Sequence, residues 1–383
     1  MPTTVERRPR KHGPPRPTRR ESRLPADAAE PGNLRANPTG GRKRVWWVAT
    51  SLALAVLAVA VISAAAGQFD TSPGDVARSI YRVLITGADP TENRIDAALW
   101  TVRFPRVLLA LFVGAALAVG GAVMQGVFAN PLAEPSIVGV SAGASVGATV
   151  AIVFGLTFVS PWLLPLAAFA GALLATLTVW TFARAGGKAA VLTLVLTGIA
   201  INAIASAGTS FLVFLGDTSS REQVMFWQLG TLSDARWQGV AVTGVIFAAG
   251  FAGCLAIRKK LDVLALGDSA ASTSGVHVEA LRVIAILLVC LLTGVAVAFS
   301  GVIAFVGLIV PHALRLAIGP SHRFLIPLSA LGGAVLLSLA DIAARTVVPF
   351  ADLPIGIFTA VVGGPLFLLL LRRTLRGQGI GGQ

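Results

Sequence analysis

The sequence predicts an all-α, polytopic membrane protein with about ten transmembrane helices. Of its 383 residues 55% are hydrophobic and only 13% are charged, against roughly 25% charged residues in soluble domains. Between Val107 and Ala183 the only ionisable side chain is Glu134. That stretch is long enough for three crossings of about 20 residues each. A soluble core has no need of so long an uncharged segment.

The formal net charge of +13 is concentrated in the first 44 residues, which hold twelve of the 31 Lys and Arg residues and eight prolines. This composition predicts a disordered basic tail at 1–44. The cluster 42–44 beside Trp46 and Trp47 suits anionic lipid headgroups, so we expect contact with the bilayer and no nucleic-acid binding.

The first apolar run extends from Val45 to Ala66, and "SAAAGQ" at 63–68 is similar to a signal-peptide cleavage site. The run is longer than the 7 to 15 residues of a signal-peptide core. We therefore predict a retained first helix, which opens a transmembrane domain at 45–376 that a short tail, 377–383, follows.

Nine apolar runs have spanning length, and a tenth, near 302–318, is interrupted by Gly307, Pro311 and Gly319. The tenth is predicted to be a short span or a re-entrant segment, because broken backbone at membrane depth must be buried in protein or line a cavity. Ten crossings place both termini on one side. The nine runs lie near 46–66, 107–128, 137–156, 162–182, 190–215, 239–257, 282–299, 325–344 and 354–371.

Basic residues beside the spans orient the protein. A cytoplasmic location of both termini agrees with the short loops, although the bias outside the tail is modest. The basic residues then predicted to be cytoplasmic are Arg184, Lys188, Arg258, Lys259, Lys260, Arg282, Arg323, Arg372, Arg373 and Arg376.

Small residues recur every four positions at Gly139, Gly143 and Gly147, with Ser141 and Ser145 between them. Such residues share one helix face and let another helix approach closely, so we predict dense helix packing. The same spacing recurs at Gly114, Ala118, Ala122 and Gly126 and at Gly356, Ala360 and Gly364.

The glycines do not form a phosphate-binding loop, which requires a Gly-Lys-Ser/Thr ending after a strand. ATP and Mg²⁺ are therefore expected on a separate subunit. Cys254 and Cys290 lie in apolar runs and indicate neither a disulfide framework nor a metal site. We expect no cofactor, no metal and no enzymatic activity on this chain.

The turn "ANPLAEP" places Glu134 between Pro131 and Pro135. We expect it at the cytoplasmic surface as a rigid turn whose charge is stabilised at a helix N-terminus, with a direct transport role as the alternative. Glu134 and Asp341 are both predicted near helix ends. An ion-coupled secondary transporter, which uses ionisable groups near the midplane, is the less favoured class.

Five long motifs together resemble the FecCD-type permeases of ABC importers, which take up iron-siderophores, haem and cobalamin. The resemblance runs in order over about 45–376. The motifs are "RFPRVLLALFVGAALAVGGAVMQGVFANPLAEPSIVGVSAGASVGA", "FWQLGTLSDARW", "LALGDSAASTSGVHVEALR", "IAFVGLIVPHALRL" and "DIAARTVVPFADLPIGIFTAVVGGPLF".

The resemblance implies a ten-helix subunit of the bacterial plasma (inner) membrane, with the cobalamin/haem-importer-like permease fold. It implies a second permease subunit, identical or closely similar, with the transport path between the two. Two cytoplasmic ABC ATPase subunits and an extracellular or periplasmic substrate-binding protein complete the expected importer.

The family's docking arginines correspond to Arg103, Arg106 and Arg345. In the predicted topology all three are external, where positive charge can steer an acidic partner. The alternatives are snorkelling at a helix end for Arg103 and Arg106 and an i,i+4 ion pair with Asp341 for Arg345.

The loop after the sixth span resembles the segment by which such permeases engage their ATPases. Asp268 is expected to cap a short helix that Gly275 ends, leaving Leu264, Leu266 and Val276 to enter a groove on the partner. A solvated connector is the alternative. Gly267 and Ala271 complete the predicted coupling residues.

Polar residues of the fifth span, Thr197, Asn202 and Ser206, are the predicted wall of the transport path. The segment "FLGDTSSREQVMFWQLGTLSDARW" most resembles actinobacterial haem-uptake members, so haem is the favoured cargo, with siderophore and cobalamin as alternatives. The histidines of the membrane domain map to its cytoplasmic half, so we expect haem to pass without axial ligation.

Overall fold

The computed structural model describes Thr3 and residues 38–67, 71–184 and 191–377, and its regular elements are helical throughout these ranges. The predicted basic tail lies mostly outside the described residues, as do 378–383. Helix α1 begins at Pro38, seven residues before the predicted start of the membrane domain. The first half of the chain forms α1 (Pro38–Ala65), α2 (Pro73–Ile85), η1 (Pro90–Glu92), α3 (Arg94–Ala98), η2 (Leu99–Arg103), α4 (Phe104–Val127), η3 (Pro135–Val138), α5 (Val140–Val153), α6 (Leu156–Val159) and α7 (Leu163–Ala183).

The second half continues the helical pattern with longer spans and two short helices at the ends of the molecule. Its elements are α8 (Val191–Leu215), α9 (Thr218–Gln228), α10 (Trp237–Leu264), α11 (Asp268–Thr273), α12 (Val278–Ser300), α13 (Val306–Ile318), α14 (His322–Thr346) and α15 (Ile355–Gly377).

Among the described residues, ten apolar helices account for the predicted crossings. Seven are long and apolar enough to span a membrane, and three shorter apolar helices are Val140–Val153, Val306–Ile318 and Ile355–Leu369. The short span predicted near 302–318 is confirmed as α13, which Gly319 ends, but the predicted interruption at Gly307 and Pro311 is wrong, because both lie inside the helix. The non-helical stretch lies before α13, at 301–305. Phe305 takes the left-handed conformation at φ 69° at this break.

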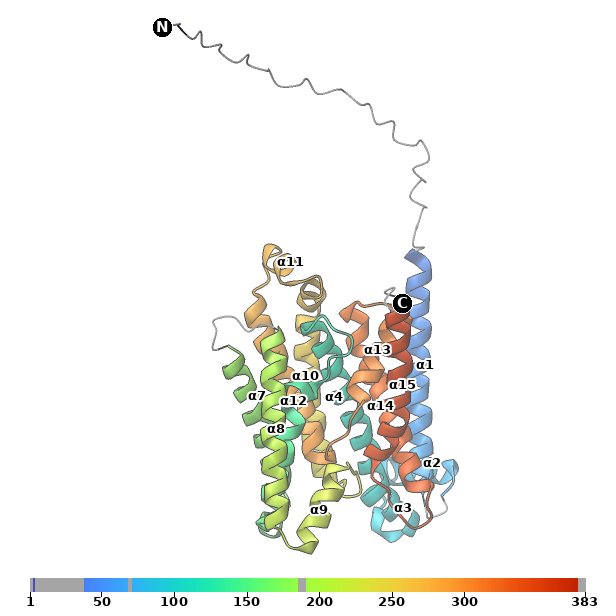
Figure 1. The fold of residues 1–383 in the computed structure, drawn as a ribbon. Coiled ribbons are helices and arrows are strands. Elements are labelled where there is room, and N and C mark those ends of the chain that lie inside the picture. Colours follow the sequence, from blue (N-terminus) through green and yellow to red (C-terminus); the bar gives the residue numbers. More distant parts are fainter. Residues whose placement is uncertain (1–2, 4–37, 68–70, 185–190, 378–383) are drawn as a thin grey trace.

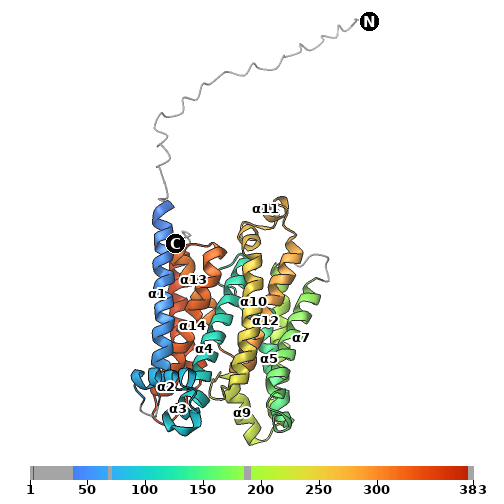
Figure 2. The ribbon, with the colours of Figure 1, turned by 180° about the vertical axis from the view of Figure 1, so that it is seen from behind.

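The N-terminal end of α1, the C-terminal end of α15 and the short helix α11 lie at one end of the bundle (Figure 1). Helices α2, α3 and α9 lie at the opposite end (Figure 2). Helix α4 is the centre of the bundle: it is buried along almost its whole length and packs against α10, α12, α13 and α14.

Because the start of α1 and the end of α15 lie at the same end of the bundle, the prediction that both ends of the membrane domain share one side is confirmed.

Two of the predicted packing glycines bring α5 and α7 together. A Cβ atom on Gly143 would overlap the carbonyl oxygen of Gly171, and one on Gly147 would overlap that of Ala167. Gly139 has another role, because it is the left-handed N-cap of α5 at φ 82° and its added Cβ would meet only ordinary contacts. The run of small residues on one face of α5 therefore begins one turn later than predicted, at Gly143.

Of the two packing glycines predicted in α15, Gly356 makes a close helix contact and Gly364 does not. A Cβ on Gly356 would overlap the carbonyl oxygen of Leu229. Within the described part of the chain, an added Cβ on Gly364 has no heavy atom within 4 Å apart from its chain neighbours and its own helix backbone. The packing prediction is wrong for Gly364 inside this subunit, since its Cβ direction points away from the neighbouring helices.

Candidate functional site

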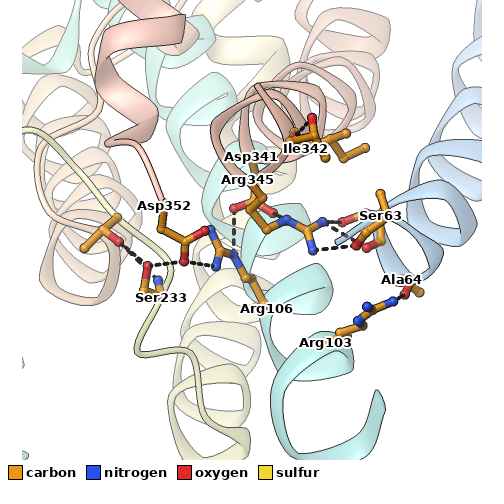
Figure 3. Close-up of polar contacts among 12 residues, drawn as sticks. Ser63, Ala64, Arg103, Arg106, Ser233, Asp341, Ile342, Arg345 and Asp352 are labelled. Carbon is orange, nitrogen blue, oxygen red and sulfur yellow. Dashed lines mark hydrogen bonds and ion pairs between the residues drawn. The ribbon is translucent and has the colours of Figure 1, made fainter. Parts of the chain in front are cut away.

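The three predicted docking arginines lie close together (Figure 3). They lie at the same end of the bundle as α3, opposite α11 (Figure 1). Arg103 closes the π-helical turn η2, Arg106 lies in the first turn of α4 after Pro105, and Arg345 lies in the last turn of α14. Each is only 6–7% exposed. Buried guanidinium groups need partners, and the structure supplies them from distant segments.

Arg106 joins two carboxylates (Figure 3). Its Nε donates to Asp341 Oδ1 at 2.9 Å and its Nη1 donates to Asp352 Oδ2 at 2.8 Å. Ser233 Oγ also donates to Asp352 Oδ2, at 3.0 Å. Burial alone would raise the pKa of Asp352, but the hydrogen bond and charge of Arg106 outweigh burial and hold that pKa below its usual value.

Arg345 and Arg103 fasten α14 and the start of α4 to the end of α1. Arg345 donates to Ser63 Oγ at 2.8 Å and to the Ser63 and Ala66 carbonyls at 2.9 and 3.0 Å. Arg103 Nη1 donates to the carbonyls of Ala64 and Ala65 at 2.8 and 2.9 Å. The last carbonyls of α1 lack helical partners, so these arginines cap its C-terminus.

The i,i+4 ion pair predicted for Arg345 is confirmed, since its Nε lies 3.2 Å from Asp341 Oδ2. Snorkelling is wrong for Arg103 and Arg106, because both side chains turn inward to buried acceptors. The three arginines still line a hollow of about 450 Å³. Three guanidinium charges against Asp341 and Asp352 leave this arginine cluster a net charge of +1. Docking by these residues stays a prediction.

At the other end, the predicted coupling loop contains the short helix α11. Gly267, at φ 109°, is its N-cap, and the left-handed Gly275, at φ 79°, follows its C-cap. The end at Gly275 is as predicted. The capping role of Asp268 is wrong: it is the first helical residue, and its Oδ1 accepts from Arg282 Nη2 at 2.7 Å.

The apolar residues of this loop differ in exposure. Leu266 is 76% exposed, whereas Leu264 is 2% and Ala271 0% exposed. Val276 is half-buried and packs against the core. Leu264 therefore cannot enter a groove on a partner in this conformation, because it ends α10 on the side that faces the bundle. Leu266 is the large apolar side chain that the loop presents.

A hollow of about 520 Å³ opens between α5, α8 and α9. Ser206 of the predicted path lines it, while Asn202 donates from Nδ2 to the Ser136 carbonyl at 3.1 Å and Thr197 lies outside the lining. Its lining is hydroxyl, amide, thioether or apolar, and the described residues around it include no ionisable side chain. The lining residues are Ser141, Ala142, Ser145, Ser206, Thr209, Ser210, Val213, Val224, Met225, Gln228 and Val302.

Sequence reasoning missed most of this lining. Ser141 and Ser145 carried a signal, since their spacing places both on one face of α5, but it was assigned to helix packing. Met225 and Gln228 belong to α9, whose fold back against α5 and α8 no local pattern indicates.

Glu134 lies deep in the bundle, which corrects its predicted place at the surface. Its Oε1 accepts from the Phe305 backbone N–H at 3.3 Å, at the start of the broken helix α13. The neighbouring Ser136 meets Asn202 halfway along α8. The chain changes direction here because Glu134 is extended, η3 is only one short 3-10 turn, and the left-handed Gly139 redirects the chain into α5. A satisfied charge in a rigid turn agrees with these contacts.

A partly buried contact that the sequence did not reveal joins α10 to α14. Asp262 Oδ1 lies 2.7 Å from His322 Nδ1 and accepts the His322 backbone N–H at 2.7 Å. Asp262 thus caps the N-terminus of α14. It lies near the C-terminal end of α10, just before the loop that contains α11. The two partners are 60 positions apart in the sequence, so no local signal predicts this pairing.

Comparison with known proteins gives consistent matches. The FecCD transport family model matches residues 54–373. The chain is 45% identical over 280 residues to the cobalamin import system permease protein BtuC of Halobacterium salinarum, covering 71% of this chain and 72% of that protein. It is 42% identical over 290 residues to the hemin transport system permease protein HmuU of Yersinia pestis, covering 72% and 84%.

A solved structure described as an inward-facing metal-chelate type ABC transporter matches with a TM-score of 0.74 at 33% identity, over 85% of this chain and 98% of that chain. The length of the family match, the ten-helix fold and this likeness agree with one another. The chain therefore belongs to the FecCD transport family and is a permease of the ABC-importer type.

Proposed function

We propose that this permease imports an iron chelate, with haem as the cargo, from a binding protein to the cytoplasm by ATP-driven alternating access. The single observation that carries the choice of cargo is the uncharged lining of the hollow between α5, α8 and α9. A lining of hydroxyl, amide and thioether groups suits a largely apolar macrocycle whose metal needs no ligand from the protein. The similarity to a hemin transport system permease supports this choice.

The transport path then lies between two copies of the chain. Helix α8, which walls the hollow, exposes large apolar side chains along its length, among them Ile199, Ile204 and Phe211 at 60–67%. A second permease subunit facing α8 would cover this surface and close the hollow into a path. Ser206 forms its wall, and Asn202 holds the Ser136 backbone behind it.

The arginine cluster is the proposed seat of the binding protein on the external face. Its hollow combines a net charge of +1 with Asp352, whose side chain is 39% exposed. An acidic side chain on the partner would displace Asp352 from Arg106 and exchange one ion pair for another. Such complementarity favours association rate and register.

The opposite end is the proposed cytoplasmic face, where two ABC ATPases bind ATP and Mg²⁺. Leu266 is the side chain that enters the ATPase surface, and the Arg282–Asp268 ion pair holds α11 against α12. Asp262 connects the end of α10 to α14. Movement at α11 would thus reach α14, whose far end carries Asp341 and Arg345.

Cobalamin is the second candidate cargo, because BtuC of Halobacterium salinarum shares 45% identity with the chain. The test is ATPase stimulation of the reconstituted importer by its binding protein loaded with hemin, cobalamin or a ferric siderophore, with the empty binding protein as control. We expect stimulation by the hemin-loaded protein alone. Stimulation by another loaded form, with hemin inactive, would replace the proposed cargo.

A further inference from the structure

Helix α2 exposes an apolar stripe that the transport function does not use. Ala77, Ile80, Tyr81 and Leu84 follow one another at the i, i+3, i+4 and i+7 spacing of one helix face. Ile80 is 41%, Tyr81 60% and Leu84 64% exposed, and the adjoining Ile85 is 70% exposed. This stripe is flanked by polar residues, including Arg78, whose side chain is 69% exposed.

The other side of α2 is fixed to the bundle, so the stripe cannot turn inward. Val76 and Ser79 are 4% and 0% exposed. Ser79 Oγ accepts from Trp100 Nε1 at 3.2 Å. Arg82 grips both carboxylate oxygens of Asp96 in α3, at 2.9 and 2.7 Å. These contacts set the rotation of α2 about its own axis.

The length of α1 indicates where α2 lies relative to the bilayer. Trp46 and Trp47 are 65% and 74% exposed near its start, as is typical of aromatic residues at a membrane interface. From Trp47 to Ala65 the helix rises 18 residues, about 27 Å, close to the roughly 30 Å hydrocarbon thickness of a bilayer. Helix α2 begins at Pro73, so it lies at the opposite interface, beside the end of α1 (Figures 1 and 2).

Helix α1 is long and apolar enough to span a membrane, and it exposes large apolar side chains along its length: Leu54 and Leu57 at 61% and 64%, and Val61 and Ile62 at 44% and 51% near the end beside α2. The two helices pack against each other, so the exposed apolar surface of the spanning helix leads to the helix that carries the stripe. Continuity with the lipid-facing surface identifies the occupant of the stripe as lipid.

We propose that α2 is an interfacial amphipathic helix that lies in the bilayer surface on the side opposite the chain termini. Ile80, Tyr81 and Leu84 insert at the boundary between headgroups and acyl chains, while Arg78 and Asp75 face water. Through Arg82 and Asp96 the membrane surface then holds α3 and the π-helical turn that carries Arg103. The inference is independent of which cargo the permease carries.

The test is spin-label accessibility of the full-length chain in lipid nanodiscs. One nitroxide is attached at Leu84→Cys and the matched control at Arg78→Cys on the polar side of the same helix, in a background where the buried Cys254 and Cys290 are replaced by alanine. Collisions with oxygen, which concentrates in the bilayer, are compared with collisions with a water-soluble nickel chelate.

We expect the label at position 84 to lose relaxation by the nickel chelate and the label at position 78 to retain it. A second label at Tyr81→Cys must repeat the result of position 84, which guards against a local disturbance. Equal nickel access at 78 and 84 would overturn the proposal. So would protection of position 84 that begins only when the binding protein is added, because the stripe would then be a protein-docking surface.

Discussion

Substitution of Asp341 by asparagine should change stability and partner association in opposite directions. Asp341 is fully buried and is the shared carboxylate of Arg106 and Arg345. Removing one member of a buried ion pair costs about 3–5 kcal/mol. Arg106 keeps Asp352, and Arg345 keeps its three oxygen acceptors on α1. We therefore expect the lower end of this range, about 3 kcal/mol.

The same substitution raises the net charge of the arginine cluster from +1 to +2. One further unit charge about 7 Å from an acidic partner group is worth about 0.6 kcal/mol in water, or about a threefold faster association at low salt. Screening over a Debye length of about 3 Å should remove this gain near 1 M salt.

The assays are equilibrium unfolding of the permease by SDS titration and stopped-flow association with the loaded binding protein. Glu92→Gln is the matched control, because it removes an exposed carboxylate from the same end of the molecule, outside the arginine cluster. We expect Asp341→Asn to unfold more easily and to associate faster, and the control to do neither. Slower association of Asp341→Asn, alongside its lost stability, would refute the assignment of the cluster as a docking surface.

Three further substitutions test the packing, the re-entrant segment and the coupling loop. Gly147→Ala should destabilise the permease by about 1–3 kcal/mol through overlap with the Ala167 carbonyl, whereas Gly364→Ala should be neutral in SDS unfolding of the isolated subunit; equal effects would contradict the α5–α7 contact. Glu134→Gln keeps an acceptor for the Phe305 N–H and should retain ATP-driven uptake, while Glu134→Ala should lose most of it; an inactive Gln variant with normal expression would assign a role to the charge itself. Leu266→Ser should leave unfolding unchanged and abolish stimulated ATPase activity, with Ser274→Ala as the control, and normal stimulation would remove Leu266 from the ATPase contact.

Much of the fold could be predicted from the sequence because each span is a local property of about 20 residues. The end of α11 at Gly275 also depends on neighbouring residues, whereas the break before α13 falls at 301–305 and not at the predicted Gly307 and Pro311. Local signals do not show the direction in which a side chain points at a helix end. Leu264 and Leu266 are two positions apart, and only the packing of α10 shows that the first is buried and the second exposed.

The candidate site depends on contacts between distant segments, which a single sequence does not reveal. Arg106 meets partners 235 and 246 residues away. The position of Glu134 likewise depends on Phe305, 171 residues later. A charged residue beside prolines is as compatible with a surface turn as with a re-entrant segment, so the depth of Glu134 could be learned only from the assembled bundle.

The most direct test of the account is uptake of hemin into proteoliposomes that contain the permease alone, the permease with its ATPase, or both with the loaded binding protein. We propose the hollow beside α8 as the path, the arginine cluster as the docking face and the loop with α11 as the coupling loop, with the driving force from ATP on separate subunits. We therefore predict uptake only in the complete set and only when ATP is on the ATPase side. Uptake by the permease alone, or uptake driven by a proton gradient without ATP, would contradict it.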